Sequence, residues 1–200
     1  MDDDMPTRVR LLRIAGLALS LALTAGCAED ARPPVRNHAP KQAYLITLTV
    51  ENPPAPVTAI EGHASYQVMN TECLPRAFFF GYPTGVRAIA EPVQFKPVSA
   101  NVWQAVVYAD LYPDQPQTDE LGVCEWKFIA AGADFSIGKI TLAATLNDEE
   151  IRAGESSTQY YEYAWLNDPV FVGARVHGNT RKREGRETFV AVVSSKEVGP

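Results

Sequence analysis

From residue 42 onward, apolar and polar residues alternate in short runs, the pattern of β-strands that bury one face. The alternation predicts strands at residues 42–51, 62–69, 86–96, 102–111, 123–130, 135–146, 158–166 and 188–196. The expected inward residues include Tyr44, Ile46, Leu48, Val50, Ala64, Tyr66, Val68, Trp103, Ala105, Val107, Ala109, Leu111, Phe189, Ala191 and Val193. About eight strands without a long helix predict an all-β fold, an antiparallel β-sandwich of immunoglobulin-like type. A closed β-barrel is the alternative.

Proline, glycine and asparagine mark where the strands break. Pro92 predicts an edge strand or a bulge in the third run, because proline cannot donate to a central ladder. Gly138 predicts a bend or a close approach of another segment in the sixth. Asn147, followed by three acidic residues, predicts one short turn of helix. The segments 112–122 and 167–186 are expected to be loops, and loops as long as the second are usually functional or mobile.

The N-terminal segment has the three zones of an export signal. Basic residues between Arg8 and Arg13 precede an apolar run of ten residues, 14–23, which is too short to span a bilayer. The following Leu23-Thr24-Ala25-Gly26-Cys27 resembles a bacterial lipobox, whose cysteine is acylated and becomes the new N-terminus. An ordinary secretory signal that happens to precede a cysteine is the alternative.

The lipobox resemblance implies a processing scheme and a location. Residues 1–26 would be a lipoprotein signal peptide, read from Met1 or from Met5, and Cys27 would carry the lipid. Residues 27–41, rich in proline, are expected to form an extended tether, and 42–200 a single β domain. In Gram-negative lipoproteins, a residue such as Ala28 after the cysteine implies anchoring in the outer membrane, facing the periplasm.

The remaining cysteines, Cys73 and Cys124, are an even pair in an oxidising compartment, which predicts a disulfide. A bridge closing a loop of this length is expected to stabilise the fold by about 4 kcal/mol. Cys124 alternates with Trp126 and Phe128, so the bridge is expected beside Trp126 in the core. A catalytic cysteine paired with His63 or His177 is the alternative.

Composition narrows the function further. A hydrophobic content of 46% excludes wholesale disorder, and a net charge of −6 argues against nucleic acid and against general binding to anionic lipids. The chain has no GxSxG, P-loop, GxGxxG or HExxH motif. Ser136 and Lys139 match SxxK without the companion motifs, and the acids at 148–150 lack calcium-loop spacing. We therefore expect no enzymatic activity, no metal and no cofactor.

Several exposed-looking residues are candidates for contact with a protein partner. Phe78-Phe79-Phe80 either divides between the core and a sheet edge or forms an exposed aromatic patch. The basic group from Arg181 to Arg186 either binds an acidic partner or is a solvated loop tip. The candidate partner-binding residues are Phe79, Phe80, Tyr82, Tyr112, Asp114, Asp119, Arg181 and Arg183.

Four stretches carry a family resemblance. They are YLITLTVENPP from Tyr44, YQVMNTECLP from Tyr66, GVCEW from Gly122 and TFVAVVSSKE from Thr188. They resemble small proteobacterial lipoproteins encoded beside type VI secretion phospholipase effectors. The resemblance implies an immunity protein that binds and neutralises such an effector, and it carries over no binding residue. The alternatives are an envelope assembly or scaffold lipoprotein without a toxin partner and a small hydrolase.

Overall fold

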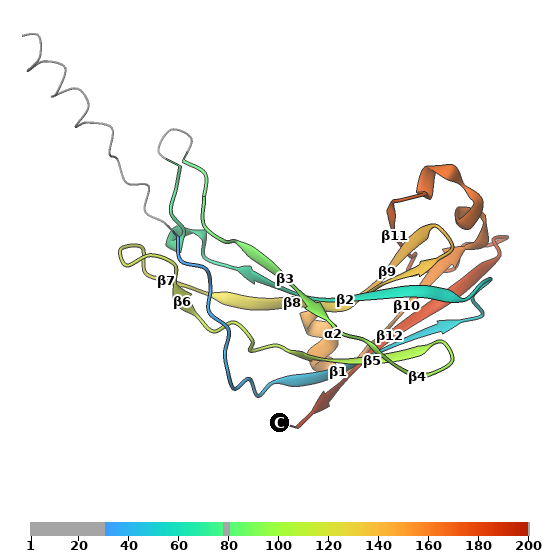
Figure 1. Cartoon of the computed structure of the whole chain (residues 1–200), viewed down its shortest axis with the longest axis horizontal. Helices are drawn as coiled ribbons and strands as arrows, with labels where there is room; N and C mark the ends of the chain where they lie inside the picture. Colours follow the sequence, from blue (N-terminus) through green and yellow to red (C-terminus); the bar gives the residue numbers. More distant parts are fainter. Residues whose placement is uncertain (1–30, 78–80, 200) are drawn as a thin grey trace, which may run out of the picture. The chain divides into compact units, whose positions relative to one another are not determined.

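Two five-stranded sheets pack face to face in the computed structural model (Figure 1). The structure describes residues 31–77 and 81–199. The predicted signal peptide, Cys27, Phe79 and Phe80 lie outside these residues. The described chain forms an antiparallel all-β sandwich without closing into a barrel, so the predicted fold class is confirmed.

The first sheet has the strand order β10-β12-β1-β5-β4, and all its pairings are antiparallel. Its strands are β1 (Ala43–Glu51), β4 (Lys96–Ser99), β5 (Val102–Tyr108), β10 (Ser156–Glu162) and β12 (Thr188–Val198). The first and last strands of the described chain are therefore neighbours at the centre of this sheet. The helix α2 (Asp148–Ala153) immediately precedes β10.

The second sheet has the order β11-β9-β8-β2-β3. Its strands are β2 (Val57–Val68), β3 (Ala88–Val93), β8 (Trp126–Ile137), β9 (Ile140–Asn147) and β11 (Arg175–His177). β11 runs parallel to β9, and the other pairs are antiparallel. β3 is an edge strand, which accommodates Pro92 as predicted.

The predicted inward faces make up much of the core. Ile46, Leu48 and Val50 from β1 belong to the same core cluster as Tyr66 and Val68 from β2, and all five are at most 2% exposed. Asn147 also behaves as predicted: it caps α2 by accepting from Glu150 N, and the Glu150 carboxylate accepts from Asn147 N. Local pattern was sufficient for these elements.

The predicted strand 135–146 is wrong, because Gly138 is a turn and not a bend. Gly138 has φ +62°, and residues 138 and 139 form the two-residue loop of a hairpin between β8 and β9. β8 in turn runs without interruption from Trp126 through the small residues at 131–133, where no strand was predicted. A Cβ on Gly132 would lie 2.2 Å from Ala144 O, so the close approach of β9 requires glycine there.

The segment 31–42, here called the N-terminal strap, packs along the domain. Arg32 N donates to Gln117 O at 2.8 Å and Asn37 N donates to Leu111 O at 2.7 Å. The Asp110 carboxylate accepts from Lys41 N and Gln42 N, at 2.8 and 3.0 Å. Residues 31–42, most of which were predicted to belong to an extended tether, therefore pack on the β domain. None of the described helices is long and apolar enough to cross a bilayer.

Candidate partner-binding surfaces

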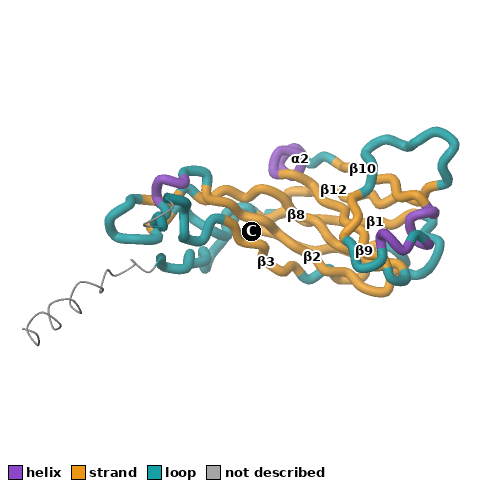
Figure 2. Tube along the Cα trace, turned by 90° about the horizontal axis from the view of Figure 1, so that it is seen from above, coloured by secondary structure: helices purple, strands orange, loops and turns teal. Residues whose placement is uncertain are grey.

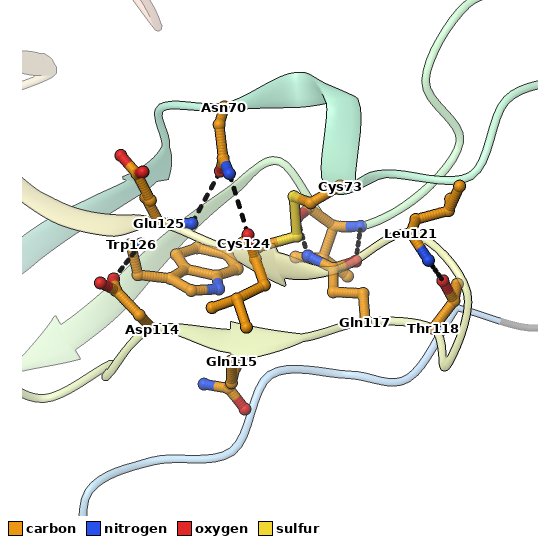
Figure 3. Close-up of a disulfide and its surroundings, with 12 residues drawn as sticks. Asn70, Cys73, Asp114, Gln115, Gln117, Thr118, Leu121, Cys124, Glu125 and Trp126 are labelled. Atoms are coloured by element: carbon orange, nitrogen blue, oxygen red, sulfur yellow. Dashed lines mark hydrogen bonds between the residues drawn. A yellow bond between two sulfur atoms is a disulfide. The ribbon is translucent and has the colours of Figure 1, made fainter.

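One end of the sandwich, here called the disulfide end, is closed by the predicted bridge. Cys73 ends η1 (Thr71–Cys73) and Cys124 ends β7 (Val123–Cys124), which pairs with β6 (Gln115–Pro116). Figure 3 shows the disulfide bond between them. Their Cα atoms are 5.2 Å apart, and 51 positions separate them in the sequence. The predicted disulfide is confirmed, and neither buried sulfur is available as a thiolate nucleophile.

Side-chain amides hold the chain around the bridge. Asn70 donates from Nδ2 to Val123 O at 2.9 Å and accepts from Glu125 N at 2.7 Å (Figure 3). The buried Gln117 accepts from Val86 N and donates back to Val86 O, at 2.9 and 2.6 Å. These contacts join segments more than 30 residues apart, so they fix the shape of this end together with the bridge.

Tyr112 belongs to the core at this end. The Tyr112 ring packs between those of Tyr66 and Trp126, whose centroids lie 5.1 and 5.6 Å from its own. Tyr112 is only 6% exposed. Its hydroxyl donates to the buried carboxylate of Glu91, which also pairs with Arg36 of the strap. Burial, followed by the hydrogen bond to Glu91, raises the pKa of Tyr112 above its ordinary value. Tyr112 is therefore not accessible to a partner, contrary to its selection as a candidate.

The other candidates at this end are mostly engaged within the chain. Asp114 accepts from Trp126 N at 2.8 Å and so orients the start of β8. Asp119 is exposed and forms an ion pair with Arg32 of the strap. Tyr82 is 57% exposed. The two aspartates therefore have structural contacts that account for them without a partner.

The opposite end, here called the loop end, carries the long connection between β10 and β12. Residues 163–187 hold two short 3₁₀ helices, η2 (Tyr163–Asn167) and η3 (Pro169–Phe171), and the strand β11. The Asp168 side chain caps η3 by accepting from Val170 N at 2.9 Å. Figure 2 shows this segment at the end farthest from η1. The predicted loop is thus largely ordered, with defined elements of its own.

A chain of aromatic contacts joins this segment to the core. Phe135 and Tyr161 are fully buried, with ring centroids 5.6 Å apart; Tyr161 meets Trp165 at 6.4 Å, and Trp165 meets Phe171 at 5.8 Å. The half-buried Trp165 and Phe171 thereby fix the two 3₁₀ helices against the sandwich. This packing attaches the 3₁₀ helices of the loop end to the core of the sandwich.

The loop end exposes apolar and basic side chains together. Val170 and Val172 are 76% and 52% exposed, the former being the most exposed large hydrophobic residue of the described chain. The segment 163–187 contains five Lys or Arg residues and three Asp or Glu residues, a balance of +2 in a chain of net charge −6. Arg183 pairs with the buried Glu162 at 3.4 Å, whereas Arg181 is exposed and pairs with no acid among the described residues.

A polar cluster lies on the outer face of the second sheet near this end. Arg175 donates from Nε to Asp134 at 2.8 Å, and its NH2 lies 3.4 Å from His63 Nε2. Burial is the main cause that lowers the pKa of His63, and Arg175 and His177 lower it further. The fold thus brings together two histidines that the sequence left scattered. A guanidinium occupies the position between His63 and Asp134, and the described residues offer no group of three metal-ligating side chains.

The candidate residues therefore divide between two ends and do not form one surface. Tyr82, Asp114 and Asp119 lie at the disulfide end, and Arg181 and Arg183 at the loop end. The sequence missed Val170 and Val172; the length of their loop was the only signal that could have found them. Comparison of the chain with protein-family models, with curated protein sequences and with solved structures finds no match.

Proposed function

We propose that this protein is a lipid-anchored protein of the outer membrane that binds and neutralises a type VI secretion lipase effector in the periplasm. The lipobox-like sequence before Cys27 supports the anchor. The four stretches that resemble immunity lipoproteins support the partner. An effector that attacks phospholipid would be met at the membrane where it acts.

The observation that carries the proposal is the loop end. High affinity between proteins usually depends on a few anchor residues at the centre of a rigid surface. Val170 and Val172 supply exposed apolar area, and Trp165 and Phe171 hold the backbone beneath them in place. Arg181, which is exposed in the same segment and pairs with no acid among the described residues, favours an acidic partner surface, because opposite charges accelerate encounter and select the partner.

The test is a binding measurement with the lipase encoded beside this gene. Val170→Asp combined with Val172→Asp should weaken the complex by at least tenfold, since each tenfold change corresponds to about 1.4 kcal/mol. Arg181→Glu should mainly slow association and reduce its salt dependence. Val106→Asp is the matched control, because Val106 is 44% exposed on β5 and pairs with Leu45, away from the loop end.

Competition between sibling cells gives the functional readout. Cells lacking this gene should be killed by a sibling that delivers the adjacent lipase, and the double valine variant should fail to protect. Unchanged survival of the deletion strain would overturn the proposed function. Recovery of an envelope assembly complex, with no lipase, from detergent extracts would instead favour the scaffold alternative.

A further inference from the structure

We propose that the disulfide end of the sandwich faces the bilayer and that its exposed apolar side chains contact the lipid surface. The proposal rests on the acylation of Cys27 that is part of the proposed function. It adds which surface meets the membrane, and therefore which surface remains available to a protein partner.

The first argument is the reach of the chain between the lipid and the fold. Five residue steps separate Cys27 from Arg32, and an extended chain covers at most roughly 18 Å over that number of residues. Arg32 is already fixed to the domain, through its N–H to Gln117 O and its guanidinium to Asp119. The loop around Gln117 therefore cannot lie farther than this from the acylated residue.

The docked strap makes this restraint specific to one end. A free tether from Cys27 to residue 42 would allow the domain to turn either end toward the membrane. The strap removes that freedom, because Val35 exchanges hydrogen bonds with the Gln115 side chain at 2.7 and 2.9 Å, and Asn37 N reaches Leu111 O. Arg36 adds its ion pair with the buried Glu91. The lipid is thereby attached at the disulfide end.

The second argument is the distribution of exposed apolar side chains. The described chain exposes nine large hydrophobic residues, and five of them lie at the disulfide end. They are Val35, Met69, Tyr82, Leu121 and Val123, between 40% and 60% exposed. Leu121 lies four residues after Gln117, and its N–H donates to Thr118 Oγ1 at 3.2 Å (Figure 3). A short linker gives a high effective concentration, so even weak apolar contacts with lipid are populated.

Charge selects the kind of lipid surface. The segment 109–125 contains five acidic residues and no Lys or Arg, which disfavours an anionic surface. Asp110, Asp114 and Asp119 are engaged by the strap or by Trp126 N. The surface that fits is therefore zwitterionic, and its headgroup layer is roughly 5–8 Å deep on each side of the hydrocarbon. The loop end points away from it.

The experiment places a fluorescent label at each end of the acylated full-length protein. Leu121→Cys and, as matched control, Val170→Cys each add one free thiol, because Cys73 and Cys124 are bridged and Cys27 is processed. Each labelled protein is reconstituted in vesicles of phosphatidylethanolamine and phosphatidylcholine that contain a lipid with a nitroxide on its headgroup. The label at 121 should lose most of its fluorescence, and the label at 170 should keep it.

A spacer separates lipid contact from simple proximity. A Gly-Ser insert of about 20 residues between residues 30 and 31 has a root-mean-square length of roughly 25 Å. Quenching at 121 that persists with the spacer supports contact, and its loss overturns contact. Equal quenching at both ends, or stronger quenching at 170, overturns the orientation. Mass spectrometry of the N-terminal peptide from the same sample identifies failure of the anchor itself, since that peptide would then carry no acyl chain.

Discussion

The bridge between Cys73 and Cys124 should provide a large part of the stability of this fold. Its sequence separation of 51 corresponds, in the chain-entropy treatment, to about 4 kcal/mol at 25 °C. The free energy of unfolding of a typical domain is only about 5–15 kcal/mol. Replacing both cysteines by alanine should therefore remove a substantial share of it. For a domain of about this size, the loss corresponds to a fall in melting temperature of roughly 8–16 °C.

The entropic reasoning applies because the native geometry around the bridge has other support. Asn70 bonds to both neighbours of Cys124, at Val123 O and Glu125 N, and Asp114 accepts from Trp126 N. The variant should consequently fold to the same structure, and most of the loss should come from a more expanded unfolded state. The dependence of the unfolding free energy on urea should become steeper for the same reason.

The assay is thermal and urea unfolding of two proteins that both carry Cys27→Ser, one with the Cys73–Cys124 bridge and one with both bridging cysteines replaced by alanine. Adding reductant to the bridged protein is the matched control and should lower its melting temperature by a similar amount. A loss below about 1 kcal/mol would refute the reasoning, because removing a native disulfide from a small secreted domain typically costs about 2–5 kcal/mol. Titration of two free thiols in the unreduced, denatured protein would refute the bridge itself.

Three further predictions concern single side chains. Asn70→Ala should destabilise the protein by about 1–3 kcal/mol in urea unfolding, because two backbone groups lose their partner. Asn70→Asp should cause a smaller loss of stability, because its carboxylate can still accept from Glu125 N. Asn147→Ala should cost about 1 kcal/mol in the same assay through loss of the α2 cap, whereas an unchanged midpoint would show that the cap is unimportant. His63 has a pKa lowered from 6.5, so the unfolded chain binds more protons: its contribution to stability is complete above pH 6.5 and is lost as the pH falls below it. His63→Gln should make the free energy of unfolding depend less steeply on pH below pH 6.5, and the same slope in both proteins would contradict this.

Alternation and terminus signals along the chain determined much of this protein. Side chains two residues apart share a face of a strand, so the buried faces of β1, β5 and β12 could be recognised without knowing their partners. The Asn147 cap is equally local, since it needs only Glu150 three residues later. The disulfide followed from the number of cysteines and the expected compartment. These features depend on residues close together in the sequence or on the number of cysteines, and both can be read from the sequence alone.

Contacts between distant segments decided the rest. The small residues of β8 form a strand because β9 approaches closely at Gly132, and alternation cannot signal this where side chains are small. Tyr112 resembles an exposed loop aromatic in sequence, but Tyr66 and Glu91 bury it. Residues 31–42 have the composition of a tether, and they are held in place by contacts with residues 110–119 and with Glu91. Burial of a loop residue depends on partners far along the chain, so the tertiary structure alone determined which candidate residues are accessible.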